Sequence, residues 1–144
     1  MRNKRARRNR NPRLRKSPIS PSIASTQNKR LVWKVTGIDD NSRWGWNQIT
    51  CPDFLRKIWD KMRSFETMTW GEILGRHHHA VAVNDIIEPA QNRLEQLGHD
   101  DQAELISFRL GSTQRIWAIR SGEDAFLLWW DPNHEIYPSS LKHT

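Results

Sequence analysis

The sequence predicts an α+β fold in which an N-terminal strand and two to three helices precede an antiparallel β-meander of three to four strands. In residues 50–65 and 89–98 the apolar residues recur at helical spacing, and a short helical piece is expected between them. From Leu105 onward the spacing changes to the two-residue period of strands. The links "GSTQ" and "SGED" in that second region each contain a glycine, which is typical of tight hairpins. Helices followed by hairpin-linked strands indicate an α+β order in a single domain.

The first 28 residues are predicted to form a disordered basic tail ahead of one compact domain, residues 29–144. Residues 1–30 contain eleven Lys or Arg and no acidic residue, so the remaining residues carry twelve basic against sixteen acidic groups. The tail has too few large apolar groups to offset the entropy of ordering. It suits sequence-independent binding to phosphates. Equally, it can be a solubilising segment or reflect a start codon assigned too far upstream, and an organelle transit peptide is a weaker alternative.

Residues 30–38, "RLVWKVTGI", alternate apolar side chains and are rich in β-branched residues, which predicts a strand. The turn-rich segment 39–49 follows as a loop with two tryptophans. The clearest helix is expected over residues 50–65, with Thr50 as its cap and Pro52 in its first turn. One broad apolar face is formed there by Phe54, Leu55, Ile58, Trp59, Met62 and Phe65.

Two shorter helices and an extended piece come next. Residues 69–74 begin with a Thr69-to-Glu72 capping-box pattern. Residues 77–83, "HHHAVAV", place valines at alternate positions and are expected to be extended. A last helix is predicted over residues 89–98, with proline at its start and glycine at its end.

The predicted meander consists of residues 105–110, 115–120 and 125–130, and the chain then turns polar. Trp129 and Trp130 end a run that is apolar at every position, so the sequence does not fix which of them faces inward. Asp131-Pro132-Asn133 is a turn signal in which the aspartate can bond to backbone amides.

Composition excludes several classes of protein. A single cysteine, Cys51, rules out an intramolecular disulfide framework and a cysteine-based zinc site, and favours a reducing compartment such as the cytoplasm. Cys51 has no Cys-His-Asn constellation around it in sequence to make it a nucleophile. No run approaches the ~18 apolar residues of a membrane span. His77, His78 and His79 are consecutive on an extended chain and point to alternate faces, so we expect loop packing there, no metal site and no cofactor.

The segment "LISFRLGSTQRIWAIRSGEDAFLLWWDPNHEIYP" resembles the C-terminal sheet of the RelE/ParE-type toxin superfamily. That pattern is a strand ending in Leu-Arg, a short turn, an arginine opening the next strand, a hairpin, and an apolar strand closing on Gly-His-Arg-Arg-Asp-Val-Tyr. Arg109, Arg115 and Tyr137 fall on the two arginines and the terminal tyrosine. The family's Gly-His-Arg-Arg is replaced here by residues 131–134, Asp-Pro-Asn-His, so two cationic positions are lost. "RIW", "LLWWDPNH" and "YPS" also resemble a group of uncharacterised bacterial proteins.

The resemblance implies a cytoplasmic toxin that cleaves mRNA without a metal, using the substrate 2′-hydroxyl as nucleophile, and that is neutralised by a small antitoxin. Arg109 and Arg115 would stabilise phosphate charge. His134, Tyr137 and His143 would act as acid or base. Lys142, Trp117 and Trp130 would bind the RNA substrate, free or on the ribosome.

Structural interpretations stand beside these roles. The arginines can be solvated strand positions, the tryptophans can be core, and His134 and Tyr137 can be packed rings. Two other functions therefore remain open. One is a non-catalytic ParE-like inhibitor or a protein-interaction module that uses a tryptophan-rich surface. The other is a nucleic-acid or ribosome-binding accessory protein that works through its basic tail.

Overall fold

The computed structural model describes residues 26–75 and 77–138, and its α+β architecture confirms the predicted fold class. The described residues form a five-stranded mixed sheet in the order β1-β5-β4-β3-β2. The predicted meander is β3 (Glu104–Arg109), β4 (Arg115–Ser121) and β5 (Asp124–Asp131), all antiparallel. The turn between β4 and β5 places Gly122 at a φ of 63°, a conformation that favours glycine.

Two further strands complete the edges of the sheet. β2 (His79–Ala82) pairs antiparallel with β3 and continues into the 3-10 turn η3 (Val83–Asp85). β1 covers only Val32–Lys34 of the predicted strand 30–38, because it pairs in parallel with just the first residues of β5. The parallel pairing of β1 with β5 joins the first strand of the described sequence to the last.

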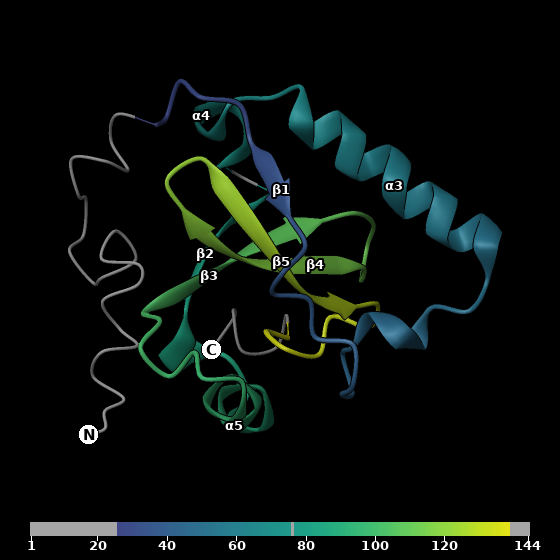
Figure 1. The fold of residues 1–144 in the computed structure, drawn as a ribbon, viewed down its shortest axis with the longest axis vertical. Helices are drawn as coiled ribbons and strands as arrows, with labels where there is room; N and C mark the ends of the chain where they lie inside the picture. The colour runs from purple at the N-terminus through teal and green to yellow at the C-terminus, as the bar shows by residue number, and fades with distance from the viewer. Residues whose placement is uncertain (1–25, 76, 139–144) are drawn as a thin grey trace.

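The helices lie on both sides of the sheet, as Figure 1 shows for α3 and α5. α3 spans Pro52–Glu66, and its N-cap is Cys51, whose side chain makes no capping bond. The predicted cap, Thr50, is therefore wrong by one residue. α4 (Trp70–Ile73) has the predicted capping box between Thr69 and Glu72. η2 (Trp46–Gln48) is a 3-10 turn in the loop before α3, and α5 (Glu88–Gln96) ends in a left-handed glycine at position 98.

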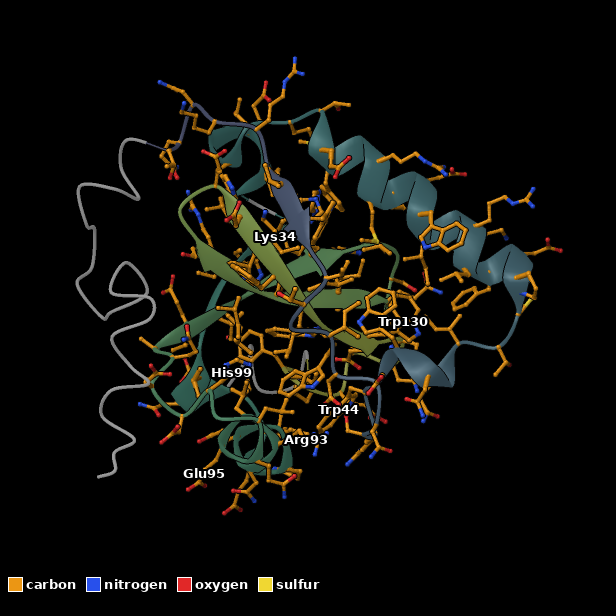
Figure 2. All side chains as sticks on the ribbon, viewed as in Figure 1. Lys34, Trp44, Arg93, Glu95, His99 and Trp130 are labelled. Carbon is orange, nitrogen blue, oxygen red and sulfur yellow. The ribbon has the colours of Figure 1, made fainter. Side chains whose placement is uncertain are left out.

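Because helices cover both faces, the sheet separates two apolar cores. The core on the α3 side includes Ile58, Phe65, Trp70, Phe108 and Trp130, and the labelled Trp130 lies close to the start of α3 in Figure 2. The core on the α5 side contains Ala90 and Leu94 from that helix, with Trp44, Trp117 and Trp129. Trp129 and Trp130 are thus both buried, on opposite faces, which is why that strand is apolar at every position.

A buried carboxylate, Asp39, joins the loop after β1 to α5 and β5. Arg93 donates to it from Nε and Nη2, each at 2.9 Å, and the Trp129 indole donates at 2.9 Å. The Ser42 hydroxyl and the Asn41 amide donate at 2.7 and 3.1 Å. Burial alone raises the pKa of Asp39, but these donors together hold it well below its usual range. The sequence had marked this segment only as a loop.

The domain begins earlier than residue 29. Arg120 donates from Nη2 to Thr26 Oγ1 and Gln27 Oε1, at 3.1 and 3.0 Å. Its guanidinium lies 4.1 Å from the centre of the Trp70 ring, and burial lowers its pKa to about 10. Residues 26–28, assigned to the tail from sequence, are therefore fixed to the sheet, while residues 1–25 lie outside the described part of the chain.

Candidate functional site

One end of the sheet brings the two predicted arginines together. Arg109 ends β3 and pairs directly with Arg115, which opens β4, and Arg115 pairs in turn with Asp131 at the end of β5. Residues paired directly across an antiparallel sheet have side chains on the same face. The prediction that Arg109 and Arg115 lie beside the first hairpin is therefore confirmed.

The two arginines have different surroundings. Arg115 is 7% exposed, and its Nη1 donates to the carbonyls of Gly111, Ser112 and Gln114 at 3.0, 3.3 and 3.0 Å. Burial, followed by the nearby charge of Arg109, lowers its pKa. Arg115 therefore braces the loop between β3 and β4, and that donor is not free to bind a substrate phosphate.

Arg109, in contrast, is exposed at the rim of an open depression. Its Nε donates to the Gly111 carbonyl at 3.3 Å, which orients the guanidinium. We call this hollow the β3 depression; it measures about 400 Å³ and is lined by His77, His78, Arg109, Leu110, Gly111 and Ser112. Among the described residues its lining contains a cation, two imidazoles and no acid, so it favours an anion.

Within this depression His78 is held by a hydrogen bond and by ring packing. Its Nδ1 accepts a hydrogen bond from the Arg109 backbone amide at 3.0 Å, and its ring packs edge-on against Phe65 with centroids 4.9 Å apart. Burial, then the charges of His77 and His79 and of nearby arginines, lowers its pKa from 6.5 to about 4. At neutral pH the imidazole is uncharged, and because Nδ1 accepts, its proton resides on Nε2. His78 can therefore act as a fixed hydrogen-bond donor to a ligand.

This state of His78 predicts a pH dependence of stability. The unfolded chain protonates the residue near pH 6.5 and the folded chain near pH 4, so the free energy of unfolding falls as the pH drops through that window. We expect His78→Gln, which keeps an acceptor for the Arg109 amide but does not titrate, to flatten this part of the curve. Urea unfolding at several pH values measures it.

The matched control for that experiment is His77→Gln, an exposed neighbour in the same depression. Burial is the largest cause of the lowered pKa of His78 and the charge of His77 is a smaller one, so we expect this variant to keep most of the wild-type slope between pH 6.5 and pH 4. If His78→Gln retained the full wild-type slope between pH 6.5 and pH 4, the neutral, buried state assigned to His78 would be wrong.

The described residues that follow β5, 132–138, begin beside the hairpin loop and are not among those that line the β3 depression. The Thr113 hydroxyl donates to the Pro132 carbonyl at 2.7 Å, which ties the turn to that loop. His134 occupies this turn with a φ of 55°, and Tyr137 packs against the α5-side core. Neither residue is among those that line the β3 depression. His143 and Lys142 lie outside the described residues.

Asp131 has the structural role that its turn signal indicated. Its fully buried carboxylate accepts the backbone amides of Glu135 and Ile136 at 2.9 and 3.0 Å. Burial raises its pKa, and these amides act in the opposite direction. Asp131 thus holds the chain reversal after β5.

The tryptophans proposed for base stacking are core residues. Trp117 and Trp130 are 0% and 2% exposed, so neither offers a ring face to RNA. Of the eight tryptophans, all in the described residues, only Trp59 is exposed, at 47%. The broad tryptophan-rich surface expected for a protein-interaction module is therefore absent from the described part of the chain.

Sequence reasoning missed His78 as a site residue. On an extended chain, His77, His78 and His79 point alternately to two faces. The same alternation, combined with the apolar Phe108 on the neighbouring strand, is the signal that one imidazole would be half-buried. No group of three potential metal ligands occurs among residues 26–75 and 77–138.

None of the helices in this described part has both the length and the apolar composition that crossing a bilayer needs. The sequence matches no family model, no curated protein and no solved structure.

Proposed function

We propose that the protein is a metal-independent endoribonuclease of the RelE-like kind, a cytoplasmic toxin kept inactive by a small antitoxin protein. The observation that carries the proposal is the pairing of the exposed Arg109 with the neutral donor His78 in one open depression. Each phosphodiester of RNA carries one negative charge, and a guanidinium can contact two of its oxygens at once.

The chemistry needs only protein groups. The 2′-oxygen of a ribonucleotide attacks the adjacent phosphorus, the bond to the 5′-oxygen breaks, and the products are a 2′,3′-cyclic phosphate and a 5′-hydroxyl. Arg109 and the Nε2–H of His78 stabilise the charge that develops on the phosphorane oxygens. The 2′-hydroxyl proton passes to a base and the leaving oxygen receives one from an acid. His77 lines the depression and is the first candidate for this role. His134, Tyr137 and His143 are the candidates that the resemblance implies.

The test is to incubate the purified full-length chain with mRNA, with and without ribosomes, and to map the ends produced. We expect new 5′-hydroxyl ends paired with 2′,3′-cyclic phosphates, in the presence of a metal chelator. Intact RNA in both reactions, together with normal growth of cells expressing the chain, would overturn the proposal.

Two alternatives are separated by the same experiment. RNA that is bound but not cut would favour the accessory protein that works through the basic tail, especially if deletion of residues 1–25 abolished binding. Growth arrest without RNA binding or cleavage would favour a ParE-like inhibitor or interaction module. Among the tryptophans only Trp59 is exposed enough to serve such a module.

A further inference from the structure

A second depression adjoins the first on the side of α3. We call it the α3 depression; it measures about 290 Å³ and is lined by Phe54, Lys57, Ile58, Lys61, Leu110 and Gln114. Leu110 also lines the β3 depression, so the two hollows share a wall. The α3 depression lies between the helix and the hairpin loop, and the β3 depression lies on the other side of Leu110.

The chemistry of the α3 depression differs from that of the first. Its walls are apolar at Phe54, Ile58 and Leu110, while Lys57 and Lys61 supply charge from one face of the helix, four residues apart. Both lysines are exposed, and neither is part of an ion pair within the described ranges. An apolar surface bordered by two cations suits a ligand that combines a flat ring with a phosphate.

The apolar wall is fixed by the core behind it. Phe54 packs edge-on against the buried Trp130, with ring centroids 5.5 Å apart, and Trp130 lies against Trp46 at 6.0 Å. On the same helix the acidic Asp60 is paired with Arg63. Asp60, which lies between the two lysines in sequence, is therefore already engaged with another cation. The hollow matches the lower end of the size range of small-ligand sites, ~300 Å³.

We infer that the α3 depression binds the nucleotide next to the phosphate held at Arg109, so that single-stranded RNA passes over Leu110 with its backbone charge facing Lys57 and Lys61. This inference rests on the proposed function, since it places a second part of the same RNA. It extends that function by assigning the binding of a neighbouring nucleotide to α3, which the sequence had marked only as a core helix.

Binding is tested on the full-length chain with a fluorescent single-stranded oligonucleotide whose 2′-positions are methylated, so that no cleavage can occur. The variant is Lys57→Gln/Lys61→Gln. The control is Lys34→Gln/Arg56→Gln, which removes the same charge from exposed positions outside both depressions and leaves the Asp60–Arg63 pair intact. All four residues are exposed, so the fold should tolerate either change, and circular dichroism checks this.

We expect the lysine variant to bind roughly tenfold more weakly at 0.1 M salt and to lower the slope of log affinity against log salt by about 1.4. The control variant should keep the wild-type slope. Equal losses in both variants, or no loss in the lysine variant, would overturn the inference. So would displacement of the RNA by an acidic peptide at lower concentration than by unlabelled RNA, because the hollow would then fit a protein partner better.

These outcomes are distinguishable from a failure of the proposed function. If the chain cleaves RNA but the lysine variant binds and cleaves as wild type does, the endoribonuclease proposal stands and the α3 site fails. If the lysine variant loses affinity as expected while no RNA is ever cut, the binding site stands without the enzyme.

Discussion

Asp39→Ala is expected to lower the free energy of unfolding by about 3 kcal/mol, because it leaves a partly buried ion-pair partner and a buried indole N–H without their acceptor. The removed carboxylate accepts from Arg93 twice and from Trp129 within the domain interior. For a domain of this size the loss corresponds to a fall in Tm of roughly 10–15 °C. Thermal and urea unfolding of the full-length chain measure it.

The control for this prediction is the adjacent Asp40→Ala, since Asp40 is exposed. We expect that variant to remain within about 0.5 kcal/mol of wild type. The pH dependence gives an independent check. The pKa of Asp39 is depressed in the folded chain, so its contribution is present above the ordinary aspartate pKa and is lost as the pH falls toward the folded value. If both variants unfolded alike, Asp39 would not join the loop, α5 and β5 as described.

The second large effect is expected at Arg109. Arg109→Gln should reduce RNA cleavage about 100-fold, the usual cost of removing one donor from a developing oxyanion. Its stability should stay within about 0.5 kcal/mol of wild type, because the side chain is exposed and the bond to His78 comes from the backbone. Rates of cleavage and urea unfolding are measured on the same preparations.

Arg115→Gln is the comparison that distinguishes binding of RNA from stabilisation of the loop. This arginine donates to three loop carbonyls, so we expect its loss to destabilise the domain by about 2 kcal/mol. Arg56→Gln, on the exposed face of α3, is expected to change neither property. Loss of cleavage in the Arg115 variant with unchanged stability, and full cleavage in the Arg109 variant, would exchange the roles assigned to the two residues.

The sequence predicted those parts of the fold that depend on local patterns. The period-two strands, the capping box at Thr69 and the long helix after Pro52 were all identifiable, since each rests on neighbouring residues. The parallel pairing of β1 with β5 was not, because it joins segments about ninety residues apart and leaves no local signal. For the same reason β1 is shorter than its apolar pattern suggested.

The candidate site likewise has a part that follows from local pattern and a part that depends on long-range contacts. The sequence placed Arg109 and Arg115 together, because a hairpin fixes which residues face each other. It did not reveal that one guanidinium is buried in the loop while the other is open, since that depends on how the loop folds back. Nor did it identify Asp39, whose burial depends on Arg93 fifty-four residues away. The burial of both Trp129 and Trp130 could not be predicted without knowing that each face of the sheet carries a core.

The most direct test of the central claim is to locate a phosphodiester on the folded chain. We would titrate the isotopically labelled full-length chain with a deoxydinucleotide, which cannot be cleaved, and follow the NMR signals of the His78 ring and the Arg109 side chain. We expect saturable shifts at both residues while the Arg93 side chain, fixed to Asp39, stays unchanged. Shifts confined to residues 1–25, with His78 and Arg109 unaffected, would contradict it.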